Sequence, residues 1–117
     1  TILIVDDSIS IRQVVGMTLK ASGYQVIEAC DGKDALAKLN GQKIHLIISD
    51  VNMPNMDGLS FVKAAKAKAE YRFTPVLMLT TESGEDKKAE GKAIGVKAWL
   101  VKPFKPELLL SAVTKLA

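Results

Sequence analysis

Cysteine is almost absent from this chain, and long hydrophobic runs are missing altogether. The single cysteine, Cys30, excludes an intramolecular disulfide framework and any zinc site built from several cysteines. Apolar runs such as Ile2–Val5 are far too short to span a bilayer, and the start of the sequence shows no signal-peptide pattern. We therefore expect a cytoplasmic protein with no membrane partner.

Aromatic residues are also scarce, at 5% of the chain. The formal net charge is +3, and the excess arises between residues 84 and 105, where six lysines accompany three acidic residues. A basic surface attracts nucleic acid or an acidic protein segment, unless the lysines simply form a solvated helix face. Because few aromatic side chains interleave with these lysines, we expect no nucleic-acid partner, and an acidic protein target instead.

Size and composition indicate one domain. Hydrophobic residues make up 48% of the 117 positions and charged residues 25%, as in ordinary globular proteins. This length is near the modal size of one domain, and the apolar content can fill a core without disulfides or metals. No linker or low-complexity tract interrupts the sequence. We predict one monomeric domain over residues 1–117.

Short apolar segments alternate along the chain with longer segments of helical spacing. Apolar runs without polar alternation are typical of strands buried on both faces of a parallel sheet. The predicted strands cover residues 2–5, 24–29, 46–48, 76–79 and 99–101, and the predicted helices cover residues 9–22, 33–39, 59–69, 85–94 and 106–116. Such alternation implies right-handed crossovers with helices on both faces. We predict an α/β fold of the flavodoxin-like (βα)5 type, a five-stranded parallel sheet in the order 2-1-3-4-5.

Polar side chains follow the predicted strands at their carboxyl ends, where open parallel sheets bind ligands. Asp6 and Asp7 follow the first strand, Asp50 follows the third, Thr80 follows the fourth and Lys102 follows the fifth. Strands 1, 3, 4 and 5 are successive neighbours in the predicted order. These side chains are therefore expected to surround one shallow pocket.

The chemistry of this pocket favours a metal and a phosphoryl group. Carboxylates about 4 Å apart repel by roughly 4 kcal/mol per pair at an effective dielectric of about 20. Such a cluster favours a hard cation, and Mg²⁺ prefers one or two carboxylates with water and a phosphate. An aspartate can then attack phosphorus while the metal, a lysine and a hydroxyl bind its oxygens. The simpler alternative is that Asp7 or Ser8 caps the following helix.

Two residues outside the pocket have structural interpretations. Gly91 lowers the stability of the predicted helix over residues 85–94 by about 1 kcal/mol relative to alanine, which indicates either a mobile helix or a close packing contact. Cys30 follows the second strand and is interpreted as a packing residue.

Four segments resemble the signature blocks of response-regulator receiver domains, most closely the single-domain chemotaxis regulators (CheY-like). They are ILIVDDS, LIISDVNMPNMDG, PVLMLTTE and KAWLVKPFKP. They stand in the family's order and spacing and span essentially the whole chain. The resemblance implies a phosphoprotein of a two-component system. It would be a phosphoacceptor signalling protein rather than an enzyme, with intrinsic autophosphorylation and autodephosphorylation chemistry.

The resemblance assigns roles within the predicted pocket. Asp50 corresponds to the phosphoacceptor, which takes a phosphoryl group from the phosphohistidine of a sensor histidine kinase. Asp7 and Asp50 correspond to direct Mg²⁺ ligands, joined by the backbone carbonyl of Asn52. Asp6 corresponds to a residue that acts on the metal mostly through a water molecule.

The resemblance also assigns residues that contact the phosphoryl group or affect its lifetime. Thr80 and Lys102 correspond to groups that contact the phosphoryl oxygens, and the bond between Lys102 and Pro103 corresponds to the family's cis peptide. Asn52 and Glu82 correspond to residues that flank the path of the hydrolytic water in the family. Their identities match the chemotaxis type, which implies a short-lived phosphoryl group.

Trp99 stands where the family usually has tyrosine or phenylalanine. In the family this aromatic side chain swings inward when the hydroxyl residue, here Thr80, moves to the phosphoryl group. An indole is larger and its N–H needs a partner when buried, so the alternative is a static anchor on the fifth strand. The resemblance implies that phosphorylation switches the face built from residues 84–116 toward a protein target, such as a flagellar switch component.

Three other functions are alternatives to that of a phosphorylated receiver. A haloacid-dehalogenase-type phosphatase also uses an aspartate and Mg²⁺, but it needs a second aspartate where this chain has Asn52. An FMN-binding flavodoxin needs a hydroxyl- and glycine-rich phosphate loop, whereas the corresponding segment, residues 6–10, is acidic. A degenerate receiver signals without phosphate, but this chain retains every key side chain.

Overall fold

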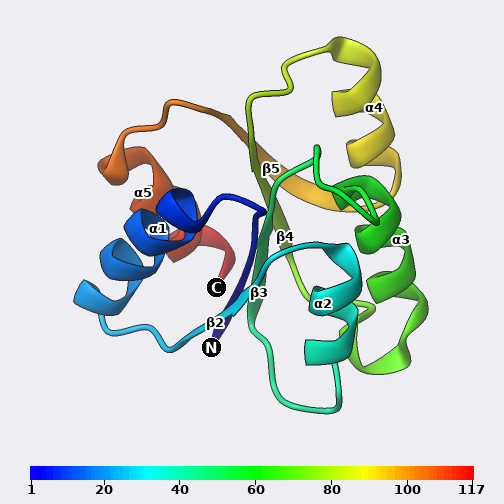
Figure 1. Cartoon of the computed structure of the whole chain (residues 1–117), viewed down its shortest axis with the longest axis horizontal. Coiled ribbons are helices and arrows are strands. Elements are labelled where there is room, and N and C mark those ends of the chain that lie inside the picture. Colours follow the sequence, from blue (N-terminus) through cyan, green and yellow to red (C-terminus); the bar gives the residue numbers. More distant parts are fainter.

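A computed structural model describes residues 1–117 as a five-stranded parallel sheet between two layers of helices (Figure 1). The strands are β1 (Ile2–Val5), β2 (Val26–Ala29), β3 (Leu46–Ser49), β4 (Val76–Thr80) and β5 (Val96–Val101). Their order is β2-β1-β3-β4-β5, and every neighbouring pair is parallel. The predicted fold and strand order are confirmed.

Five α-helices and one short 3₁₀ turn connect the strands. The helices are α1 (Ile9–Ala21), α2 (Gly32–Lys38), α3 (Gly58–Ala67), α4 (Glu85–Ala93) and α5 (Pro106–Leu116), and the 3₁₀ turn is Ala69–Tyr71. Figure 1 shows α1 and α5 on one side of the sheet and α2, α3 and α4 on the other. None of these helices has both the length and the apolar character needed to cross a membrane.

The differences from the predicted elements lie mainly at the sheet edge and after α3. The strand predicted over residues 99–101 begins at Val96, because the outermost strand tolerates the exposed, charged Lys97 within it. The helix predicted to continue to residue 69 ends at Ala67, and the 3₁₀ turn follows.

The core forms two layers that share the sheet. Strands β1, β3 and β4 are buried at every position, as their uninterrupted apolar runs predict, whereas the edge strands β2 and β5 are partly exposed. Phe61 and Tyr71 belong to the cluster under α2 and α3. Leu19 and Leu109 belong to the cluster under α1 and α5. This core holds the carboxyl ends of the strands in fixed positions.

Two local interpretations are decided by the structure. An ideal Cβ on Gly91 would lie 2.9 Å from Cζ3 of Trp99, and Gly91 is buried, which supports the close-packing alternative. The interpretation of Cys30 as a packing residue is wrong, because this thiol is exposed. It follows β2, which is an edge strand of the sheet.

Candidate functional site

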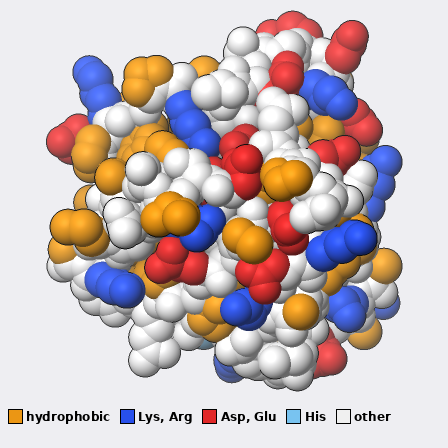
Figure 2. Space-filling model, viewed as in Figure 1, with side chains coloured by type: hydrophobic (Ala, Val, Ile, Leu, Met, Phe, Trp, Pro, Cys, Tyr) orange, Lys and Arg blue, Asp and Glu red, His pale blue; other side chains and the backbone are white.

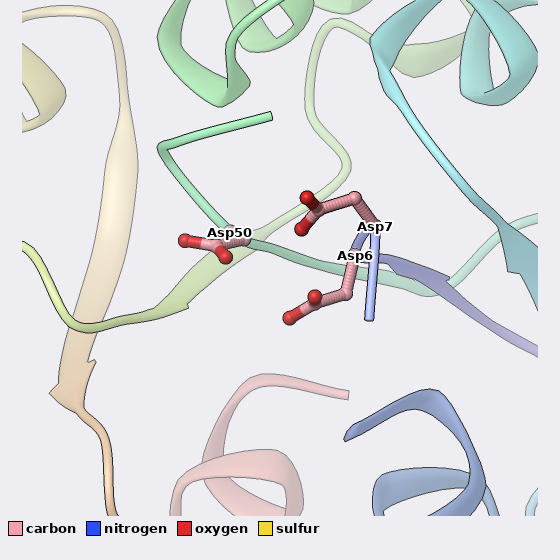
Figure 3. A group of neighbouring side chains, drawn as sticks. All are labelled: Asp6, Asp7 and Asp50. Atoms are coloured by element: carbon pink, nitrogen blue, oxygen red, sulfur yellow. The ribbon is translucent and has the colours of Figure 1, made fainter. Parts of the chain in front are cut away.

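An acidic cluster forms where β1 and β3 end side by side. The sheet register pairs Val5 with Ser49, so the next residues along each strand, Asp6 and Asp50, lie next to each other. One carboxylate oxygen from each of Asp6, Asp7 and Asp50 lies within 4.8 Å of the others. Figure 3 shows the three carboxylates around one shared space. The structure thus brings together the three acids that the sequence places at strand ends.

Backbone and lysine donors hold the Asp50 carboxylate. Its Oδ1 accepts hydrogen bonds from the backbone N–H groups of Val51 at 2.7 Å and Asn52 at 3.3 Å. Its Oδ2 lies 3.2 Å from Nζ of Lys102. Asp50 is 7% exposed, so only a small part of this side chain is open to an approaching group.

Asp6 is the most buried member of the cluster, and both of its carboxylate oxygens have donors. Oδ1 accepts from the backbone N–H of Ser8 at 2.9 Å, and Oδ2 accepts from Nζ of Lys102 at 2.7 Å. Burial raises the pKa of Asp6, and the hydrogen bond from Lys102 opposes part of that change. Burial alone would lower the pKa of Lys102, but hydrogen bonds and charge from Asp6 and Asp50 outweigh it and raise that pKa. Lys102 is therefore a firmly protonated cation between two acids.

Asp7 is exposed, and no hydrogen bond engages its side chain. The helix cap of α1 is Ser8, whose Oγ accepts from the N–H of Ile11 at 3.3 Å, so the capping alternative does not apply to Asp7. In the view of Figure 2, acidic side chains lie near the middle of the visible face, with basic side chains around them. Three clustered carboxylates with one free member form a hard oxygen donor set, which fits Mg²⁺.

A second group of side chains lies beside the cluster, at the end of β4. Thr80 is fully buried, and its Oγ1 accepts from the backbone N–H of Glu82 at 3.1 Å. The indole Nε1 of Trp99 donates to the carbonyl of Glu82 at 2.9 Å. Two hydrogen bonds through Glu82 therefore connect the hydroxyl of Thr80 with the indole of Trp99.

Asn52 and Glu82 are less directly engaged with the cluster. Asn52 is exposed, and only its backbone N–H contacts Asp50. The carboxylate of Glu82 accepts from the backbone N–H of Gly84 at 3.1 Å, within its own loop. The peptide bond between Lys102 and Pro103 is cis, as the resemblance implies.

Three supporting residues had no assigned role at the level of sequence. An ideal Cβ on Gly58 would lie 1.9 Å from the carbonyl oxygen of Asp50, so only glycine permits this approach. Nη1 of Arg12 donates to the carbonyl of Asp6 at 2.6 Å. Nδ2 of Asn55, a residue at φ 67°, donates to Asp31 at 2.7 Å. Only the glycine had a sequence signal, its place directly after the helix cap Asp57.

Comparison with known proteins gives consistent matches over nearly the whole chain. The family model described as the response regulator receiver domain matches residues 2–114. Protein PilG of Pseudomonas aeruginosa is 38% identical over 112 residues, which cover 96% of this chain and 83% of PilG. Chemotaxis protein CheY1 of Helicobacter pylori is 37% identical over 110 residues, which cover 92% of this chain and 89% of CheY1.

Solved structures agree in fold as well as in sequence. Chemotaxis protein CheY4 of Vibrio cholerae is 55% identical and superposes with a TM-score of 0.94, covering 99% of this chain and 97% of CheY4. A CheY-like receiver domain protein from Methanospirillum hungatei superposes with a TM-score of 0.92 at 26% identity, covering 97% of this chain and 90% of that one. With the parallel sheet and the acidic cluster at its carboxyl end, these matches lead to one conclusion: the chain belongs to the family of response regulator receiver domains.

Proposed function

We propose that this receiver, as one domain over residues 1–117, takes a phosphoryl group onto Asp50 from a sensor histidine kinase. The observation that carries the proposal is the Asp50 carboxylate itself. It lies 3.2 Å from Lys102 and shares a space with two further acids, at the open end of a buried strand. The names of its relatives, chemotaxis proteins among them, support a role in chemotaxis or motility signalling.

Phosphoryl transfer needs little beyond positioning and charge neutralisation. A carboxylate oxygen of Asp50 attacks the phosphorus of the phosphohistidine, and the phosphorus–nitrogen bond breaks. The electron pair of that bond returns to the imidazole ring of the kinase. Lys102, already between Asp6 and Asp50, neutralises charge on the phosphoryl oxygens, and the hydroxyl of Thr80 donates to another of them.

The metal role falls to the acidic cluster. Asp7, Asp50 and the backbone carbonyl of Asn52 would hold Mg²⁺ directly, with Asp6 acting through a water molecule. When bound, Mg²⁺ supplies positive charge that compensates the carboxylates and the phosphoryl oxygens. Asp7 is the side chain best placed to respond to the ion, because the protein leaves it exposed and without a hydrogen bond.

Loss of the phosphoryl group is a hydrolysis, in which water attacks phosphorus and the acyl-phosphate bond to Asp50 breaks. Asn52 is exposed beside Asp50, and Glu82 is partly exposed beyond Thr80. We propose that they set the lifetime of the phosphoryl group.

The route from the site to the surface runs through the two hydrogen bonds of Glu82. If the Thr80 hydroxyl turns toward the phosphoryl group, the backbone N–H of Glu82 loses its hydrogen bond to Thr80. Because the carbonyl of Glu82 accepts from the indole of Trp99, a shift of Glu82 reaches Trp99. Two grooves flank β5 on this side of the molecule. One of about 230 Å³ is lined by Lys88, Lys92 and Trp99, and one of about 330 Å³ lies against α5. We propose this α4-β5-α5 face, with its lysines, as the docking face for an acidic target such as a flagellar switch component.

The test uses Trp99 as the reporter, since it is the only tryptophan in the chain. Fluorescence is recorded while Mg²⁺ and then beryllofluoride, a phosphoryl mimic, are titrated into wild type, Asp50→Asn and Glu70→Gln. We expect a saturable, Mg²⁺-dependent change in wild type and in Glu70→Gln, an exposed acid away from the cluster. Asp50→Asn should lose the response to beryllofluoride.

Calorimetry on the same samples separates the two parts of the proposal. Absence of both ion and mimic binding in wild type would contradict the phosphoacceptor site. Binding without any fluorescence change would retain that site and reject Trp99 as a moving part.

A further inference from the structure

A basic hollow lies at the end of the sheet opposite the acidic cluster. It measures about 500 Å³ and lies at the amino ends of β4 and β5. Its lining includes Lys66 of α3, Arg72 and Phe73 of the following loop, Ile94 after α4, and Lys97 of β5. We call it the basal hollow. No acidic side chain lines it.

The cations of the basal hollow lack acidic partners. Lys66, Arg72 and Lys97 take part in none of the protein's ion pairs. The ammonium of Lys66 donates to the carbonyl of Thr74, which leaves it further N–H donors. Burial lowers the pKa of Lys66, and the charge of Lys97 lowers it further. The cations that line the hollow therefore repel one another, and a bound anion would relieve that repulsion.

An aromatic ring stands directly beside these cations. Phe73 is 86% exposed, the largest fraction among the exposed large hydrophobic side chains. The guanidinium of Arg72 lies 5.9 Å from the centroid of this ring, within the range of a cation–π contact. A ligand that fits both features carries negative charge and an apolar group side by side.

The spread of the cations favours separate carboxylates over a compact phosphate. Lys66 lies in the last turn of α3, and Ile94 is the C-cap of α4, so the hollow lies at two helix carboxyl ends. The partial negative charge of these ends opposes any bound anion, so binding rests on the three cations, and no helix amino end lines the hollow to offer the free N–H groups that phosphates favour. The three cations also come from separate elements, which suits charges spread along a chain.

We propose that the basal hollow binds an acidic segment of a partner protein, with an apolar side chain packed on Phe73 and carboxylates paired with Lys66, Arg72 and Lys97. This docking site is separate from the phosphorylation site and does not need Asp50.

The test is an NMR titration of the full chain with the peptide acetyl-Asp-Glu-Leu-Glu-Asp-amide. Saturable backbone amide shifts are expected at residues 72–74 and 94–97. A control peptide with Asn and Gln in place of the acids should give none. Shifts confined to α5 or to the acidic cluster, or no saturable shifts at all, would overturn the proposal.

Matched variants test the named contacts. Phe73→Ala and Arg72→Glu should each weaken peptide binding by about tenfold, because both remove a central contact from a small interface. Lys43→Glu makes the same change in net charge at an exposed site outside the hollow and should bind like wild type. Asp50→Asn should also bind like wild type.

Two results would contradict these expectations. If Lys43→Glu weakened peptide binding as much as Arg72→Glu does, the loss of binding would be due to net charge and not to a contact in the hollow. Inorganic phosphate that reproduced the same shifts and displaced the peptide would show a simple anion site instead of a peptide site.

Discussion

Asp7 is the carboxylate of the acidic cluster that the protein itself leaves uncompensated. Asp6 and Asp50 both contact Lys102, whereas Asp7 is exposed without such a partner. At a separation of up to 4.8 Å, repulsion in a water-like dielectric amounts to about 1 kcal/mol per pair. Without a metal, the Asp7 charge therefore opposes folding.

Asp7→Asn should accordingly be more stable than wild type in EDTA, by roughly 4 °C in Tm for about 1 kcal/mol. The same variant should lose most of the Tm increase that Mg²⁺ gives to wild type, since an ion that binds only the folded state stabilises it. Thermal unfolding with EDTA and with Mg²⁺ measures both effects. A variant that kept the full Mg²⁺ increase would show that Asp7 is not a ligand.

Gly91 of α4 packs closely against the indole ring of Trp99 on β5. In an open helix, Gly→Ala gains about 1 kcal/mol. Here the new Cβ would lie 2.9 Å from the indole ring, so Gly91→Ala should instead destabilise the domain by roughly 1–3 kcal/mol. It should also change Trp99 fluorescence, because the displaced indole loses its hydrogen bond to Glu82.

A double-mutant cycle supplies the control. With the ring removed by Trp99→Ala, adding Gly91→Ala should stabilise the domain by about 1 kcal/mol, as propensity alone predicts. Urea unfolding of the four proteins measures the coupling. Equal effects of Gly91→Ala in both backgrounds would mean that the contact is unimportant.

At the scale of elements, the β3–α3 loop is tied to the start of α2 by side chains. Asp31 is the N-cap of α2 and accepts from the N–H of Asp34 at 2.8 Å. Its other oxygen accepts from Asn55 at 2.7 Å, in the loop that also carries Asn52. These hydrogen bonds hold the pKa of Asp31 below its ordinary value. The clamp therefore links α2 to a loop next to the acidic cluster.

Asn55→Ala should weaken Mg²⁺ binding severalfold without removing any proposed ligand, because the loop backbone is less well positioned. Asp31→Ala should do the same and also lose the helix cap. The control is Ser60→Ala, an exposed side chain at the start of α3, where the contact with the cap Asp57 is made by the backbone N–H. Calorimetric Mg²⁺ titration measures the affinities, and unchanged binding in Asn55→Ala would reject the clamp's role.

For the whole molecule, the two core layers lie on opposite faces of one sheet, so we expect them to unfold together. Leu19→Ala, at 0% exposure in the α1 layer, should cost about 2–5 kcal/mol. Phe61→Ala, at 0% in the other layer, should cost about 3–5 kcal/mol. Met17→Ala, on the same helix as Leu19 but 71% exposed, should change stability by about 0.5 kcal/mol or less.

Denaturant unfolding followed by both Trp99 fluorescence and circular dichroism measures these values. Coincident transitions in each variant are the expected result. Separate transitions in Phe61→Ala and Leu19→Ala would mean that the layers unfold independently.

The sequence by itself determined the alternation of buried parallel strands with helices, and the place of the acidic cluster at strand ends. Uninterrupted apolar runs are typical of strands covered on both faces, and parallel strands bring their carboxyl ends to one edge. Asp6, Asp7 and Asp50 could therefore be grouped without coordinates. Edge strands gave a weaker signal, since partial exposure lets Lys97 interrupt the apolar pattern.

Only the tertiary structure decided the contacts between residues far apart in the chain. Neither periodicity nor spacing specifies that Gly91 packs on Trp99, that Asn55 reaches Asp31, or that Asp7 stays free while Ser8 caps α1. The basal hollow has the same origin, because its cations come from α3, the following loop and β5. Local sequence sets local conformation and burial, whereas hydrogen bonds and charge pairs between distant segments depend on how the helices pack against the sheet.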